Sequence, residues 1–253
     1  MLDLVAAIAS TPMARQWSCF EAAALVWGCD TVDLGQHVDL NQEFNQHAGP
    51  DGRVRRHHSV IPDDQLTVVD GIPVTSLART VVDCARVLPG RRAIVIADSA
   101  ARQGLTREEI DRVLGTVAGR RGVRRARDLL ELVDSGAASP GETLTRWLLL
   151  SHGLPRPVTQ VPITTERGAR YGDLGWPDLR VVVEFDGRVK YSPLFSADPR
   201  VTVIEERRRH EALEAAGWVV VRVAWEDLRD PAEVVSRVRT AIARARALGL
   251  HDA

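Results

Sequence analysis

Lysine is almost absent from this sequence of 253 residues. Lysine and arginine together number 33, and Lys190 is the one lysine, which leaves 32 arginines. An ammonium group is a compact charge with a tunable pKa, whereas a guanidinium is a planar fork that stays protonated. The lone lysine therefore indicates a position where arginine would not serve, although an accident of composition would give the same count.

Long apolar runs and paired cysteines are missing as well. No apolar run approaches the roughly 18 residues of a membrane span, and the N-terminal "MLDLVAAIASTPMAR" lacks the basic start of a signal peptide. The cysteines Cys19, Cys29 and Cys84 are odd in number and far apart, so they predict neither a disulfide framework nor a zinc site. We therefore expect a cytoplasmic protein without a membrane partner.

The net charge is also close to zero, at -1, and the pI is about 6.7. The protein as a whole therefore has no positive electrostatic field that would attract nucleic acid. Binding to nucleic acid would have to use local basic patches. Two segments provide them, "GRRGVRRARD" with Arg120, Arg121, Arg124, Arg125 and Arg127, and "RRRH" with Arg207, Arg208 and Arg209. We interpret both as candidate phosphate contacts, with solvated helix faces as the alternative.

The first part of the chain reads as a small unit of helices and strands. A short helix, "SCFEAAALVWG", is preceded by Ser18 and Glu21 in capping-box spacing. Strands follow, with Asp70-Gly71 as a hairpin turn. Helical spacing resumes at "TSLARTVVDCAR" and continues to Gly136. His57 and His58 have no carboxylate or cysteine at ligand spacing, so we interpret them as strand surface.

The second part has the element order α-β-β-β-α-β-α. Ser139 caps its first helix, predicted over about 140–152, and Pro140 occupies the first helical position. The elements that follow are the strands "VTQVPIT", "RYGDLGWP" and "RVVVEFDG", a helix over about 199–216, the strand "WVVVRVAW", and a last helix from Pro231 to about Leu248. With 45% hydrophobic residues the chain can form a sizeable core, and we predict domains over 1–136 and 137–253.

Carboxylates gather on two neighbouring strands of this second part. Glu184 and Asp186 in "VVVEFDGRVKY" lie at i and i+2 and so share a face of an apolar strand. Buried there, they must be paired, protonated or bound to a cation. Asp173 lies on the preceding strand, and carboxylates on adjacent strands suit Mg²⁺ or Mn²⁺. With Lys190 close by, the pattern predicts metal-assisted phosphodiester hydrolysis.

These residues resemble the PD-(D/E)XK nuclease superfamily, in particular its very-short-patch-repair-like endonuclease domains. The resemblance covers about residues 139–250 and implies an α/β fold with a restriction-endonuclease-like core. It implies Asp173 and Glu184 as metal ligands and Glu142 as a supporting acid. In place of the usual Glu-x-Lys the sequence has Glu-Phe-Asp, so the role of the lysine would pass to Lys190 or be lost.

The N-terminal region resembles a different family, the AbiEi-like antitoxins, through "SCFEAAALVWG" and "IPDDQLTVVDGIPVTSLARTVVDCAR". That resemblance implies a winged-helix-like start and a part in DNA binding and regulation. The structural alternatives also stand: Glu142 forms a capping box with Ser139, and both Asp173 and Asp186 precede turn residues that their side chains could cap.

The sequence thus predicts a metal-dependent endonuclease acting on DNA. The alternative is a non-catalytic DNA-binding or antitoxin-like transcriptional regulator with a degenerate nuclease fold, and a third interpretation has RNA as the substrate. Sequence preference and oligomeric state are not predicted.

Overall fold

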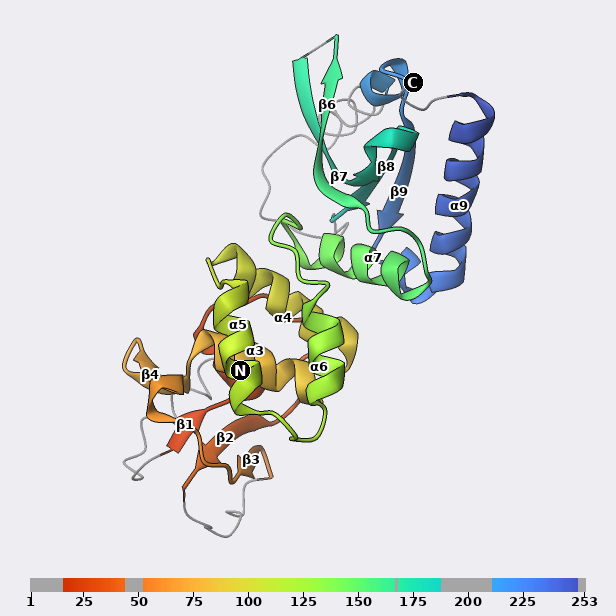
Figure 1. Cartoon of the computed structure of the whole chain (residues 1–253). Coiled ribbons are helices and arrows are strands. Elements are labelled where there is room, and N and C mark those ends of the chain that lie inside the picture. The colour runs from red at the N-terminus through yellow and green to blue at the C-terminus, as the bar shows by residue number, and fades with distance from the viewer. Residues whose placement is uncertain (1–15, 44–51, 167, 188–210, 250–253) are drawn as a thin grey trace, which may run out of the picture. The chain divides into compact units, whose positions relative to one another are not determined.

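The computed structural model describes residues 16–43, 52–166, 168–187 and 211–249. Contacts divide the chain into two compact units, Met1–Ser135 and Gly136–Ala253. The described part is a mixed α/β protein with one open sheet in each unit (Figure 1). Each unit is described separately below.

The first unit is built on a five-stranded sheet in the order β3-β2-β1-β5-β4. Its strands are β1 (Gln16–Ser18), β2 (Val38–Gln42), β3 (Val54–His57), β4 (Leu66–Val69) and β5 (Ile72–Thr75). β2 runs antiparallel to β1 and parallel to β3, while β5 joins the other side of β1. The predicted turn at Asp70-Gly71 closes the β4–β5 hairpin, and both residues have the positive φ that a two-residue hairpin turn requires.

The described ranges of this unit contain five helices that pack around the sheet, and α3 to α6 gather on one side of it in Figure 1. They are α2 (Phe20–Val26), α3 (Leu77–Val87), α4 (Gly90–Arg102), α5 (Arg107–Thr116) and α6 (Val123–Leu130). Ser76 caps α3, and Thr106 with Glu109 forms a complete capping box on α5. Local sequence therefore sets where these two helices begin.

Two predictions for this unit are wrong. Ser18 is the last residue of β1 and Cys19 is the N-cap of α2 without a side-chain cap, so the Ser18–Glu21 capping box does not form. Glu21 is instead paired with Arg92 of α4. The helical run predicted to reach Gly136 ends at Leu130, and the backbone N–H of Asp134 donates to the carboxylate of Asp98 on α4 instead of continuing the helix.

The second unit begins with α7 and continues into a four-stranded sheet in the order β6-β7-β8-β9. Its elements are α7 (Pro140–Ser151), β6 (Val158–Thr165), β7 (Gly168–Trp176), β8 (Val181–Asp186), β9 (Val219–Ala224) and α9 (Pro231–Ala247). β6, β7 and β8 are antiparallel neighbours, and β9 runs parallel to β8. Residues 211–215 are helical, while 199–210 of the predicted long helix lie outside the described residues.

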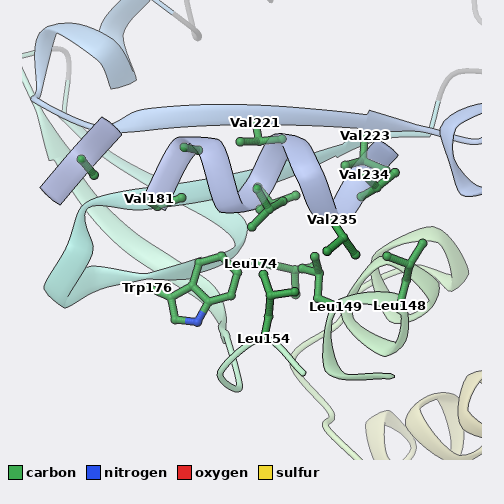
Figure 2. Close-up of a cluster of buried hydrophobic side chains, with 14 residues drawn as sticks. Leu148, Leu149, Leu154, Leu174, Trp176, Val181, Val221, Val223, Val234 and Val235 are labelled. Atoms are coloured by element: carbon green, nitrogen blue, oxygen red, sulfur yellow. The ribbon is translucent and has the colours of Figure 1, made fainter. Parts of the chain in front are cut away.

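The sheet of the second unit has a hydrophobic cluster on each face. Leu148 and Leu149 of α7 pack with Val181, Val223 and the buried valines of α9 on one face (Figure 2). Val161, Ile163 and Val182 pack with Leu213 in a second cluster. Alternate valines of β8 therefore serve opposite cores, which is why this strand reads as a continuous apolar run.

Candidate functional site

Glu142 lies in the first turn of α7, and its carboxylate is engaged in local hydrogen bonds. It accepts from the backbone N–H of Ala138 at 2.8 Å and from the hydroxyl of Ser139 at 2.8 Å. Gln160 of β6 reaches the same carboxylate at 3.4 Å. The capping interpretation of Glu142 therefore describes its surroundings, and its part as a supporting acid stays a prediction.

Asp173 and Glu184 stand one position beyond Leu174 and Val183, the last paired residues of the β7–β8 ladder. The carboxylate of Asp173 accepts the backbone N–H of Phe185 at 2.7 Å, so this side chain takes the place of a backbone partner where the ladder ends. Glu184 is buried, with 8% of its surface exposed. The hairpin thus brings two carboxylates onto adjacent strands at the point where the strands separate.

The start of α7 packs directly against this end of β8. A Cβ atom added to Gly141 would lie 1.9 Å from the ring of Phe185, so only glycine allows the helix to come this close. The ring of Phe185 also meets Trp225 edge-on, with centroids 5.2 Å apart. Packing therefore fixes the backbone on both sides of Glu184.

The remaining predicted residues of this set are less well defined. Asp186 is half-buried at the end of β8. Lys190, Arg207 and Arg208 lie outside the described residues. Within the four described ranges, no group of three or more His, Cys, Asp or Glu side chains is arranged to hold a metal ion. The metal-ligand role of Asp173 and Glu184 therefore stays a prediction.

The arginine segment, residues 120–127, covers the α5–α6 connection and the first turns of α6. Arg120, Arg121, Arg124, Arg125 and Arg127 are all exposed. In the described part of the chain none of the five makes an ion pair, and Arg120 donates only to the carbonyl of Val60, at 3.5 Å. Other arginines of the same unit do pair with carboxylates: Arg79 and Arg86 with Asp83, Arg91 with Asp33, Arg92 with Glu21, Arg102 with Asp30, and Arg107 with Asp111 and Glu131.

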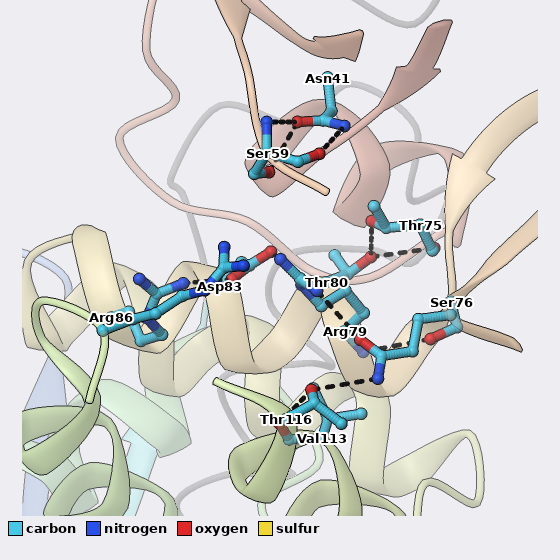
Figure 3. Close-up of polar contacts among 12 residues, drawn as sticks. Asn41, Ser59, Thr75, Ser76, Arg79, Thr80, Asp83, Arg86, Val113 and Thr116 are labelled. Atoms are coloured by element: carbon cyan, nitrogen blue, oxygen red, sulfur yellow. Dashed lines mark hydrogen bonds and ion pairs between the residues drawn. The ribbon is translucent and has the colours of Figure 1, made fainter. Parts of the chain in front are cut away.

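A buried polar ladder on α3 holds the arginine segment in place. Arg79 is 2% exposed and donates to Asp83 at 2.5 Å, and Asp83 also accepts from Arg86 at 2.7 Å (Figure 3). Arg86 in turn donates twice to the carbonyl of Arg121, at 3.2 and 3.1 Å. Gly122, at a φ of 82°, lies against the Arg86 carbonyl, where an added Cβ would come within 2.3 Å.

A third group of polar side chains was not predicted from the sequence. His57 lies on β3 as predicted and is half-buried, but it also has a carboxylate partner that the sequence did not reveal, with 2.8 Å between its Nε2 and Oδ1 of Asp39 on β2. The signal was hidden because β2 and β3 pair in parallel, and a parallel pairing joins residues that are far apart in the sequence. His58, by contrast, is exposed.

The three cysteines are buried and reduced. Burial raises the pKa of Cys29 to about 11 and raises the pKa of Cys19 and Cys84 as well. A thiol nucleophile must be ionised near neutral pH. Burial therefore keeps these three thiols protonated and disfavours them as nucleophiles.

Comparison with known proteins identifies the class to which the first unit belongs. Residues 17–132 match the family described as the AbiEi antitoxin C-terminal domain, which confirms the resemblance of the N-terminal region to AbiEi-like antitoxins. The matched region contains the α3 ladder and all of the arginine segment.

Two relatives match most of the length of the chain. Uncharacterized protein Rv2248 and uncharacterized protein MT2308, from two strains of Mycobacterium tuberculosis, are each 30% identical to this chain over 243 residues, covering 92% of it and 83% of the relative. The chain belongs to the same family as these two proteins. No solved structure matches it.

The length and apolar character of the helices bear on membrane insertion. None of the helices in the described ranges combines the length and apolar character needed to cross a bilayer.

Proposed function

We propose that the protein is a DNA-binding regulator of the antitoxin type, whose first unit contacts the phosphate backbone of duplex DNA through the arginine segment. The observation that carries the proposal is a set of exposed arginines that make no ion pair within the described residues, whereas Arg79, Arg92 and Arg107 of the same unit pair with carboxylates. The match of residues 17–132 to an antitoxin domain supports the same conclusion.

The position of the arginines favours binding over stability. Arg124 and Arg125 lie in the first turn of α6, where the helix dipole disfavours positive charge. Such cations cost the isolated helix about 0.3 to 1 kcal/mol each. A phosphate group placed there would interact favourably with both the guanidinium groups and the free N–H groups of the first turn. The two arginines are therefore explained better by a polyanionic partner than by folding.

Replacing Arg120, Arg121, Arg124 and Arg125 with alanine should weaken duplex binding on unrelated sequences to a similar extent. Each lost phosphate contact should also reduce the slope of log affinity against log salt by about 0.9. Fluorescence anisotropy with two unrelated duplexes, at several salt concentrations, measures both quantities.

The matched control removes the same charge from the exposed arginines of the second unit, Arg229, Arg239, Arg244 and Arg246. It should leave affinity and slope nearly unchanged. An unchanged slope in the first variant would make the arginine segment a solvated face, and stronger binding to RNA than to DNA would redirect the proposal to RNA.

A second candidate function is metal-dependent nuclease activity in the second unit. It is favoured by the element order of this unit and by Asp173 and Glu184 at the end of the β7–β8 ladder. Two carboxylates are enough to fit Mg²⁺ or Mn²⁺, which usually keeps several waters. Asp173 and Glu184 would hold the ion, which would supply a more acidic bound water and stabilise negative charge on phosphate.

The nuclease candidate is tested by supercoiled-plasmid nicking with Mg²⁺ and with Mn²⁺, together with thermal denaturation. Glu184→Gln should lose nicking and the rise in Tm caused by the metal, while Lys190→Ala should lose nicking by orders of magnitude and keep the rise in Tm. Lys190→Arg should restore little of the nicking activity that Lys190→Ala loses. If the wild type nicks with neither metal, the second unit is not a nuclease and the regulator proposal is unaffected.

A further inference from the structure

A small polar cavity in the first unit includes none of the residues of the arginine segment in its lining. Its volume is about 110 Å³. It is lined by Phe20 and Glu21 of α2, Gly35 and His37 before β2, Asp39 of β2, Arg55 and His57 of β3, Val87 and Leu88 at the end of α3, and Arg92 of α4. Four elements and the segment before β2 thus contribute charged or titratable side chains to one space.

One buried carboxylate organises one wall of the cavity. Asp39 is 6% exposed and lies opposite Arg55 in the β2–β3 register. Its Oδ1 is 2.8 Å from His57 Nε2 and 3.8 Å from Arg55 Nη1. Because Asp39 engages Nε2, the other ring nitrogen of His57 is left for a further interaction. Arg55 Nη2 also lies 3.3 Å from His37 Nδ1, which ties the second imidazole to the same group.

The opposite wall repeats the pattern of a buried acid with an arginine. Glu21 is paired with Arg92, with 3.0 Å between Arg92 Nε and Glu21 Oε1. Beside it, Phe20 has a φ of 52°, a left-handed backbone conformation that a residue with a Cβ rarely adopts. That strained backbone holds the Phe20 ring against His57, with ring centroids 4.6 Å apart.

The charge balance of the cavity points to the kind of ligand it accepts. Arg55 and Arg92 balance the charges of Asp39 and Glu21, and the two imidazoles complete the polar lining. Arginine and protonated histidine offer only N–H donors. A cavity of about 110 Å³ that is lined by such donors suits a small anion.

We propose that this cavity is a binding site for a single phosphate group, held by Arg55, His37 and His57. Val87 and Leu88 of its lining directly follow Arg86, which bonds the carbonyl of Arg121. The cavity and the arginine segment therefore flank the same end of α3. The phosphate could belong to a nucleic-acid backbone or to a free phosphate or mononucleotide, and the site does not depend on whether the arginine segment binds DNA.

The experiment follows the imidazole signals by NMR while the full-length chain is titrated with sulfate and then with inorganic phosphate. Sulfate should bind saturably and shift the signals of His37 and His57, because both rings line the cavity. Glu21, Asp39, Arg55 and Arg92 are the other charged groups that face the two imidazoles.

Arg55→Gln should weaken anion binding by about tenfold or more, because it removes a charge-assisted donor. The Arg55 side chain is 56% exposed on an edge strand, so the variant should fold. His57→Gln should weaken the affinity, while the control His58→Gln, at an exposed neighbour, should leave it unchanged. Equal anion affinity in Arg55→Gln, His57→Gln and wild type would overturn the proposal, as would the absence of saturable binding at about 10 mM sulfate.

Two competition experiments identify the molecule to which the bound phosphate group belongs. Competition of sulfate by a duplex, with the same dependence on Arg55, assigns the site to a backbone phosphate. Competition by a nucleoside monophosphate but not by the duplex assigns it to a small molecule. If the arginine-segment variant loses duplex binding but still binds sulfate, the anion site is independent of DNA binding by the arginine segment.

Discussion

At the scale of single residues, the first unit depends on a charge that is fully enclosed. Arg79 is 2% exposed and donates to Asp83 and, at 3.0 Å, to Gln65, whose amide in turn donates to Thr116 of α5. Buried ions are tolerated only when their donors are satisfied. This one side chain therefore connects α3 to the segment before β4 and, through Gln65, to α5.

Arg79→Ala should lower the free energy of unfolding of the first unit by about 3 to 5 kcal/mol, because it leaves the Asp83 carboxylate buried with part of its compensation removed. Urea denaturation followed by circular dichroism measures the change. Arg107→Ala is the matched control: Arg107 also bonds two carboxylates but is 42% exposed, and exposed pairs contribute about 0 to 1 kcal/mol. Similar losses in the two variants would show that burial of Arg79 is not what matters.

At the scale of elements, glycine decides how closely α7 can approach β8. Gly141→Ala would place a Cβ 1.9 Å from the ring of Phe185, and overpacking of this kind costs about 1 to 3 kcal/mol. Gly115→Ala offers the control, since it lies inside α5 with nothing within 4 Å of an added Cβ. That change should stabilise the protein by up to about 1 kcal/mol.

Thermal denaturation of Gly141→Ala and Gly115→Ala gives the two shifts in Tm, which should have opposite signs. An unchanged Tm in Gly141→Ala would mean that the ring of Phe185 moves aside at little cost. In that case the end of β8 would not be a fixed support for Glu184.

The same scale shows which parts of the structure were predictable. The Asp70-Gly71 hairpin and the Ser139-Pro140 helix start follow from local backbone chemistry, and both are confirmed. The Ser18–Glu21 capping box is a local signal that a distant interaction overrides, because Arg92, 71 positions later, pairs with Glu21.

One candidate site was predictable from the sequence and another was not. Asp173 and Glu184 lie on strands that are consecutive in the sequence, so their neighbourhood was predictable. The cavity around Asp39 was not, because it depends on parallel pairing of β2 with β3 and on helices that come later in the chain. Hydrophobic periodicity contains no information about which parallel strands pair.

At the scale of the whole molecule, we expect duplex binding to belong to the first unit alone. The arginine segment and the α3 ladder lie within Met1–Ser135, which has its own sheet and hydrophobic cluster. A fragment of residues 1–135 should therefore keep the duplex affinity of the full chain to within about threefold, since the phosphate contacts supply most non-specific binding.

The complementary fragment, residues 136–253, should bind the same duplex much more weakly at equal salt. Anisotropy titrations of both fragments, after circular dichroism has shown that each is folded, make the comparison. Duplex binding that follows the second fragment would contradict the assignment of DNA contact to the first unit.

The strand order of the first unit also has a consequence for its synthesis. β1 lies at the centre of the sheet but precedes the sheet's other four strands in the chain, and its partner Val74 on β5 follows Ser18 by about 56 residues. At about 5 to 20 residues per second, translation takes roughly 3 to 11 s to deliver that partner. Throughout this interval one edge of β1 has no native strand to pair with, and an unpaired edge is a template for foreign strands. The nascent chain is therefore most exposed to mispairing, and most in need of a chaperone, before β5 emerges.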